Sequence, residues 1–139
     1  MEKFIPDAYY KSIYDIDYKK LKKKGIKCIL FDLDNTVASY KEDVPSRDVK
    51  ELFHMLENDF KVIIFSNSHK KRLTPFKEIL NVDVAFSSKK PFKKKYLKIM
   101  EIYKYKPEEM CAIGINRIGG FSVFLNSIST KEPPWTKFD

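Results

Sequence analysis

The chain has little of what builds disulfide frameworks, zinc sites or membrane spans. It contains two cysteines in 139 residues, Cys28 and Cys111. Each lies in an apolar stretch, where a free cysteine behaves as a small hydrophobic residue, and a disulfide framework or a zinc site needs more ligands. No apolar run approaches the roughly 20 residues of a membrane-spanning helix, and the N-terminus lacks the apolar core of a signal peptide. We therefore expect a cytoplasmic protein that does not cross a membrane.

Acidic residues are outnumbered by basic ones, with 19 Asp and Glu against 27 Lys and Arg and a net charge of +8. Such a charge attracts phosphates, anionic lipid surfaces and nucleic acids alike. The alternative is that lysine simply occupies exposed positions, because it is also abundant far from any motif. Neither basic segment, 19–27 or 93–98, forms a recognised nucleic-acid module, so we do not expect nucleic acid as a partner.

The length suits one domain with a hydrophobic core of its own. We expect residues 1–139 to form a single domain that begins with a basic N-terminal arm over residues 1–25. Within this arm, residues 9–14 suit either a short helix or a packed segment. Asp17 suits the cap of a helix that Gly25 ends.

Apolar runs alternate with helical patterns along the rest of the chain. Residues 26–31 form a nearly continuous apolar run, typical of a strand buried on both faces. Further strands are expected at 61–65, 82–86 and 110–113, and helices at 46–58, 69–80 and 92–103. On the second of these helices, the spacing predicts that Leu73, Phe76 and Ile79 face inward. This alternation predicts an α/β fold with a mainly parallel sheet.

Polar side chains follow three of these strands where each one ends. Asp32 and Asp34 follow the first strand, Ser66 follows the second, and Lys89 and Lys90 follow the third. Parallel sheets bind ligands at this edge. One carboxylate can attack phosphorus and form an aspartyl-phosphate, while the other protonates the leaving oxygen and then activates water. An Asp-x-Asp-x-Thr pattern taken alone can also be an ordinary turn or helix cap with no catalytic role.

The remaining groups suit phosphate chemistry as well. Ser66 can hydrogen-bond a phosphoryl oxygen, and a lysine can neutralise the charge that builds on it. Magnesium prefers oxygen ligands and would relieve the repulsion between carboxylate and phosphate.

These segments resemble motifs of the haloacid dehalogenase superfamily. Residues 29–36 resemble its first motif, residues 63–67 its second, and Lys90-Pro91 its third, with Lys89 as the alternative lysine. Blocks at 6–7, 11–17, 24–27 and 128–132 are similar to the YqeG-like family of subfamily IIIA. The resemblance implies a three-layer Rossmann-like fold. The short gaps between motifs leave no room for a cap, so an open site for large substrates is expected.

The resemblance also implies a role for each matched residue. Asp32 would be the nucleophile and a magnesium ligand. Asp34 would be the general acid and base, and its backbone carbonyl would bind Mg²⁺. Ser66, Asn67 and Lys90 would bind the substrate phosphate. The implied activity is magnesium-dependent hydrolysis of a phosphomonoester through an aspartyl-phosphate. Relatives include phosphatidylglycerophosphate phosphatases, so a lipid head group is the leading substrate, and the basic N-terminal segment suits peripheral contact with an anionic membrane.

The sequence departs from the family after the fourth predicted strand. There the family carries a Gly-Asp pair and a further Asp, whereas Gly114 is followed by Ile115 and Asn116, with no acidic residue before Glu132. Asn116 is the candidate substitute ligand through its amide oxygen. An alternative function follows from the loss: a catalytically weak or inactive module that binds phosphate or a partner.

The chain is also short in this region, so the fold is expected to be truncated after the fourth strand, with an atypical part over 115–139. Only residues 115–120 precede the apolar run 121–125, and a parallel crossover needs about a dozen residues or more. That run is therefore expected to form a hairpin, a displaced edge strand or a disordered tail.

Overall fold

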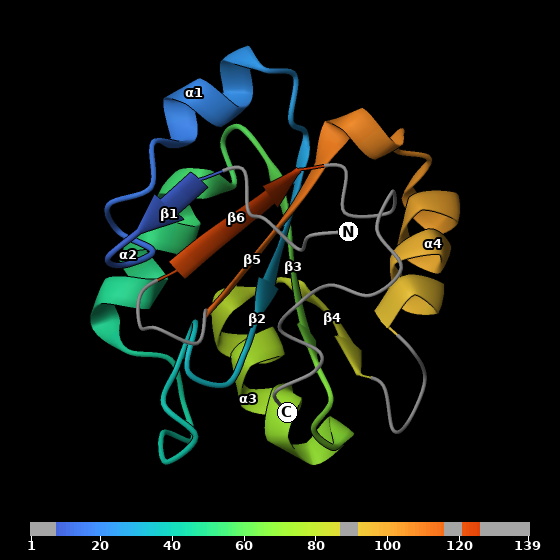
Figure 1. The fold of residues 1–139 in the computed structure, drawn as a ribbon. Helices are drawn as coiled ribbons and strands as arrows, with labels where there is room; N and C mark the ends of the chain where they lie inside the picture. The colour runs from blue at the N-terminus through green and yellow to red at the C-terminus, as the bar shows by residue number, and fades with distance from the viewer. Residues whose placement is uncertain (1–7, 87–91, 116–120, 126–139) are drawn as a thin grey trace, which may run out of the picture.

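The computed structural model describes residues 8–86, 92–115 and 121–125 of the chain (Figure 1). Its strands form one six-stranded sheet in the order β1-β6-β5-β2-β3-β4. The strands are β1 (Ala8–Tyr10), β2 (Cys28–Asp32), β3 (Lys61–Ser66), β4 (Asp83–Phe86), β5 (Met110–Ile115) and β6 (Phe121–Leu125). The helices are α1 (Tyr18–Lys23), α2 (Arg47–Leu56), α3 (Lys70–Leu80), α4 (Phe92–Tyr103) and the short 3₁₀ helix η1 (Pro107–Glu109).

The centre of the sheet is parallel, as the alternation of strands and helices predicts. β2 lies between β5 and β3, with Ile29 paired to Cys111 on one side and to Val62 on the other. β4 extends this parallel part beyond β3. The first four residues of β2 are buried, which fits a strand covered on both faces.

Helices cover both faces of the sheet, so the fold has the three layers that were predicted. On one face, Phe31 and Ile64 pack in a core with residues of α1, α2 and α3. On the other face, Leu30 and Ile63 pack with Ile99 of α4. Consecutive strand residues thus enter opposite layers. Across the described ranges, no helix combines the length and the apolar character needed to cross a membrane.

Two antiparallel strands continue the sheet beyond β5. β6 pairs with β5, placing Val123 opposite Ile113, and β1 pairs with β6, placing Ala8 opposite Val123. The hairpin is one of the three outcomes expected for residues 121–125, and antiparallel neighbours need no long crossover. Residues 8–10 form a strand rather than a short helix, because pairing with β6 satisfies backbone groups that this edge would otherwise expose.

Local signals set the ends of the first helix. The carboxylate of Asp17 accepts a hydrogen bond of 3.1 Å from the backbone N–H of Lys20 and caps α1. Gly25, just past the helix, has φ of +93°, a conformation that favours glycine. The predicted start and stop of this helix are both confirmed.

On α3, one predicted inward-facing residue is wrong. Leu73 and Phe76 are buried as predicted, but Ile79 is 47% exposed and Leu80 is buried instead. The helix ends at Asn81, whose φ is +54°. The buried stripe therefore advances by three residues and then by four, and Ile79 falls beside it.

The two cysteines should be unreactive in the folded protein. Both are fully buried, and burial raises the pKa of the Cys28 thiol to about 12. Because the thiolate is the reactive form, we expect iodoacetamide to leave both cysteines unmodified at neutral pH and to alkylate both in urea. Mass spectrometry of the two samples checks this. Native alkylation as fast as that of the unfolded chain would contradict the packing.

A polar cluster at the opposite end of the sheet from Asp32 should make stability depend on acid pH. The Tyr103 hydroxyl donates to Asp83, and the Lys61 ammonium lies 2.9 Å from the same carboxylate. The hydrogen bond from Tyr103 and, to a smaller extent, that from Lys61 lower the pKa of Asp83. A lowered native pKa stabilises the fold above the unfolded value of about 3.9, and this stabilisation is lost as the pH falls through the native pKa.

We therefore expect Asp83→Asn to lower the urea midpoint at pH 7. The deficit should shrink as the pH falls from about 5 toward 3. Urea titrations of both proteins at several pH values measure it. A deficit that stays constant over this range would rule out the linkage.

Candidate active site

Asp32 and Asp34 reach the carboxyl edge of the sheet in different ways. Asp32 is the last residue of β2 and is half-buried. The strand does not continue through Asp34, which lies in a tight turn. The backbone N–H groups of residues 36, 37 and 38 all donate to the Leu33 carbonyl, at 3.2, 3.0 and 3.2 Å. Asn35 has φ of +64°, a conformation that asparagine tolerates better than most residues.

The Asp34 carboxylate is held by two side chains from the segment that follows β3. Its Oδ2 accepts a hydrogen bond of 2.9 Å from the Ser68 hydroxyl. Its Oδ1 lies 3.0 Å from Nη2 of Arg72, in an ion pair whose side chains are 33% and 18% exposed. Asp34 therefore has a fixed orientation at the edge of the sheet.

Ser66 lies beside the first motif, as predicted. It ends β3, is 2% exposed, and its Oγ accepts a hydrogen bond of 2.9 Å from the backbone N–H of Ser68. The backbone N–H of Leu33 donates to the Phe65 carbonyl at 3.2 Å, which extends the contact between the two motifs past β2. Asn67 is the next residue and is exposed. The structure thus brings Asp32, Asp34 and Ser66 to one edge of the sheet.

Sequence reasoning missed two residues that contact Asp34 in the candidate site, Ser68 and Arg72. Their signal was available: arginine occurs only three times in a chain whose other 24 basic residues are lysines. A planar guanidinium suits fixed, multiple hydrogen bonding better than an ammonium does. An isolated arginine a few residues after the second motif was therefore the clue.

Other predicted site residues lie outside the described residues. These are Lys89, Lys90 and Asn116, whose roles remain predictions. The neighbouring strand can be placed, however: Ile113 of β5 pairs with Phe31 of β2. The end of β5, after which the family carries its fourth motif, therefore runs beside the end of β2.

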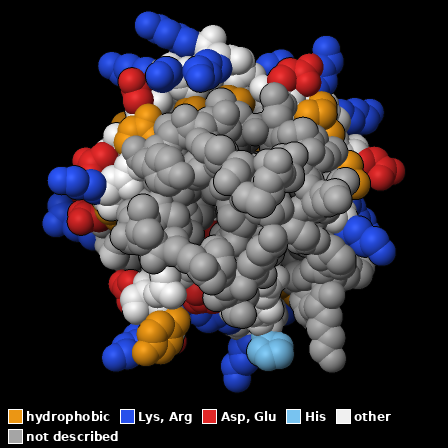
Figure 2. All heavy atoms as spheres, in the orientation of Figure 1, with side chains coloured by type: hydrophobic (Ala, Val, Ile, Leu, Met, Phe, Trp, Pro, Cys, Tyr) orange, Lys and Arg blue, Asp and Glu red, His pale blue; other side chains and the backbone are white. Residues whose placement is uncertain are grey.

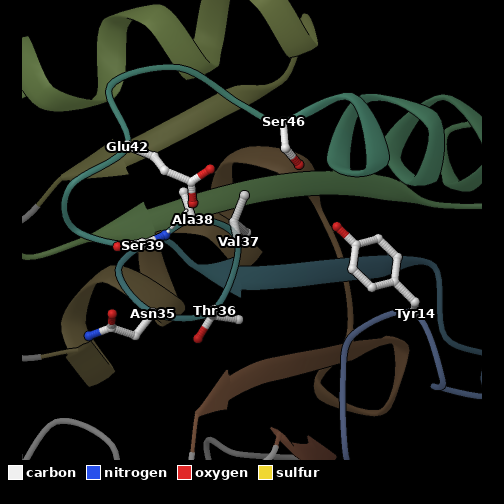
Figure 3. A pocket seen from close by; sticks show the side chains of 8 residues that line it. All are labelled: Tyr14, Asn35, Thr36, Val37, Ala38, Ser39, Glu42 and Ser46. Atoms are coloured by element: carbon white, nitrogen blue, oxygen red, sulfur yellow. Dashed lines mark hydrogen bonds between the residues drawn. The ribbon is translucent and has the colours of Figure 1, made fainter.

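An open cavity of about 390 Å³ adjoins the turn that carries Asp34 (Figure 3). Its lining is Tyr14, Asn35, Thr36, Val37, Ala38, Ser39, Glu42 and Ser46. Figure 3 shows the Tyr14 hydroxyl directed into this space, from the side opposite Asn35. Burial raises the pKa of Tyr14, so its hydroxyl is neutral at physiological pH. The lining is rich in hydroxyl groups and includes one carboxylate.

Described basic side chains are visible at the rim of the view in Figure 2. Lysine and arginine side chains project all around the outline of the molecule in that view. This distribution fits lysines that occupy exposed positions generally.

Comparison with known proteins identifies the family. The sequence profile described as "Mitochondrial PGP phosphatase" matches residues 1–119. The chain belongs to this phosphatase family. The protein named "Probable phosphatase YqeG" of Bacillus subtilis (strain 168) is 31% identical to this chain over 146 residues. That match covers 98% of this chain and 85% of the relative. The predicted YqeG-like membership is confirmed.

Two solved structures share the fold of this PGP phosphatase family member. One is the "putative 3-deoxy-D-manno-octulosonate 8-phosphate phosphatase from Vibrio cholerae", with a TM-score of 0.55 and 16% identity. The match covers 71% of this chain and 62% of that chain. The other, a hypothetical protein of Xanthomonas campestris, has a TM-score of 0.55 and 12% identity, with coverage of 79% and 66%. The chain thus spans less than two thirds of either structure. The predicted haloacid dehalogenase fold is confirmed.

The site of this PGP phosphatase family member offers oxygen donors suited to Mg²⁺. Asp32 supplies a carboxylate. The backbone hydrogen bonds of the described turn leave the Asp34 carbonyl oxygen unused. Mg²⁺ is commonly held by one or two carboxylates together with water and substrate phosphate. Within the described ranges, no group of three or more His, Cys, Asp or Glu is placed to hold a metal.

Proposed function

We propose that this phosphatase hydrolyses phosphomonoesters through an aspartyl-phosphate on Asp32, with Mg²⁺, and that phosphatidylglycerophosphate is its substrate. The observation that carries the proposal is the grouping at the sheet edge. Asp32 ends the central strand, Asp34 is anchored two residues later, and Ser66 ends the neighbouring strand. This grouping supplies a nucleophile in Asp32, a general acid and base in Asp34, and a hydrogen-bond donor to phosphate in Ser66.

The residues divide the reaction into two steps. An Asp32 carboxylate oxygen attacks phosphorus, the ester P–O bond breaks, and Asp34 gives its proton to the leaving oxygen. Asp34 then takes a proton from water, which attacks the aspartyl-phosphate, releases inorganic phosphate and restores the Asp32 carboxylate. Because a serine hydroxyl both donates and accepts, Ser68 can partner Asp34 in either protonation state.

Phosphate is held by the second motif. The Ser66 hydroxyl accepts from the Ser68 backbone and keeps its own proton for a phosphoryl oxygen. Asn67, and Lys90 or Lys89, are proposed to complete the phosphate contacts. Asp32 and the Asp34 backbone carbonyl would hold Mg²⁺, and Asn116 is a further candidate ligand. The ion would reduce the repulsion between carboxylate and phosphate.

The lipid substrate is proposed from the family and from the open site. The connections that flank the site are short: residues 33–46 join β2 to α2, and residues 67–69 join β3 to α3. Neither holds an inserted lid, so a phosphate on a large molecule can approach. The net charge of +8 favours an anionic surface. Peripheral contact with such a membrane is part of the proposal.

Phosphate release tests this function directly. The protein is assayed with vesicles containing phosphatidylglycerophosphate and, separately, with a small aryl phosphate, in Mg²⁺ and in EDTA. We expect release in Mg²⁺, loss of it in EDTA, and a higher kcat/KM on the vesicles. Release that persists in EDTA contradicts the metal requirement. Turnover of the aryl phosphate alone contradicts the lipid substrate.

A binding module without turnover is the second candidate, and one observation favours it. Gly114 lies near the end of β5, the strand beside β2, which carries Asp32. No acidic residue follows it before Glu132, so the acidic metal ligands that the family carries there are missing. Absence of phosphate release from folded protein, together with calorimetric binding of inorganic phosphate, would establish this alternative.

A further inference from the structure

Arg72 connects three parts of the site edge. It lies in the first turn of α3, and its guanidinium is mostly buried. Nη2 donates to the Asp34 carboxylate at 3.0 Å and to the Ser39 carbonyl at 3.1 Å, and Nη1 donates to the Glu42 carbonyl. Its guanidinium carbon lies 5.2 Å from the centre of the Phe76 ring. The side chain is thus fixed from several directions.

The segment bound by Arg72 is a closed turn with little packing of its own. The Glu42 backbone N–H donates to the Ser39 carbonyl at 2.9 Å, and the Glu42 carboxylate accepts from the Ser39 N–H at 2.8 Å. The large side chains beside it face solvent, with Tyr40 65% and Val44 52% exposed. Because burial contributes little here, hydrogen bonds hold the turn, and those from Arg72 connect it to α3.

We propose that Arg72 is a positioning residue that fixes the Asp34 carboxylate and ties the turn of residues 39–42 to α3 as one wall of the site. The catalytic part of this inference rests on the proposed function of Asp34. The turn also supplies Ser39 and Glu42 to the adjoining cavity, so Arg72 shapes that cavity as well.

The donor pattern favours positioning over direct phosphate binding. An arginine has five N–H donors in a fixed fork. Both N–H groups of Nη2 are used by Asp34 and Ser39, and Nη1 uses one on Glu42. Bidentate binding of phosphate through Nη1 and Nη2 would require breaking the contact with Asp34 or with Ser39, since both N–H groups of Nη2 are already used. A lysine could not replace these contacts, because its ammonium is compact and lacks the planar fork.

The test compares Arg72→Gln and Arg72→Lys with the wild type and with Arg47→Gln. Arg47 is the matched control: its side chain is 87% exposed and pairs with Glu51 at 3.2 Å within α2. Three readouts are taken on the full chain: hydrogen exchange of the amides of residues 35–42, kcat and KM on an aryl phosphate, and inhibition by inorganic phosphate.

We expect both Arg72 variants to speed exchange in residues 35–42 by roughly tenfold or more, as local opening becomes easier. We expect kcat to fall about 10- to 100-fold from misplacement of Asp34, with KM and phosphate inhibition nearly unchanged. Arg72→Lys keeps the charge and should recover little of kcat. Added guanidinium should raise the kcat of Arg72→Gln. Arg47→Gln should match the wild type in every readout.

Two results would overturn the proposal. One is weaker inhibition by phosphate, by about tenfold or more, with unchanged exchange, which would make Arg72 a phosphate ligand. The other is unchanged exchange and kcat in both variants. If the wild type releases no phosphate, the proposed function fails, while hydrogen exchange still decides whether Arg72 holds the turn. Arg72→Lys serves this purpose even if Arg72→Gln does not fold.

Discussion

Asp32→Asn is expected to lower kcat for phosphate release by at least about a thousandfold, as removal of a catalytic nucleophile does in other enzymes. An amide has nearly the shape of the carboxylate but does not attack phosphorus at a useful rate. Asp32 also supplies the carboxylate proposed to bind Mg²⁺, so the substitution removes both contributions together. Release of inorganic phosphate from an aryl phosphate measures the effect.

Two further variants separate chemistry from folding. Asp43→Asn removes an exposed carboxylate from the same loop and should leave kcat unchanged. Asp34→Asn should lower kcat by about 10²- to 10⁴-fold, the usual contribution of general acid–base catalysis. Its loss should be smaller with an aryl leaving group, which needs little protonation, than with an alkyl one. Turnover by Asp32→Asn close to that of the wild type would contradict the assignment of the nucleophile.

The parts of the fold that could be predicted from sequence are those that depend on local signals. The run at 26–31 is apolar enough to indicate a buried central strand, and β2 is one. Ser46 accepts from the Val49 N–H at 3.2 Å and begins α2 where a capping serine predicts. Asp32 and Ser66 come together because the ends of adjacent parallel strands share an edge. None of these inferences requires knowledge of a distant contact.

The parts that could not be predicted depend on contacts between distant residues. Arg72 and Asp34 are 38 positions apart, and nothing in the local pattern of α3 shows that its first turn faces the turn after β2. β1 exists only because β6 is available as its neighbour. Asp34 lies in a turn and not on the strand, since three backbone N–H groups converge on one carbonyl.

The side chains of α3 provide the second large effect, on stability. Leu73→Ala is expected to lower the free energy of unfolding by about 2–5 kcal/mol, the usual cost of emptying a buried leucine site. Leu73 has no exposed surface and packs in the core between α3 and the sheet. Typical domains have a stability of about 5–15 kcal/mol, so this change would remove a large share of it.

Ile79→Ala on the same helix is the matched comparison, because it deletes a similar aliphatic side chain. Ile79 is 47% exposed, and alanine is the better helix former, so the change should stay within roughly 0.5 kcal/mol. Urea denaturation of both variants measures the difference, and an unchanged slope with denaturant shows that it reflects stability. Equal losses would mean that Ile79 does face the core, as its spacing alone predicts. Unequal losses would show that the buried stripe of α3 runs through Leu73, Phe76 and Leu80 and leaves Ile79 beside it.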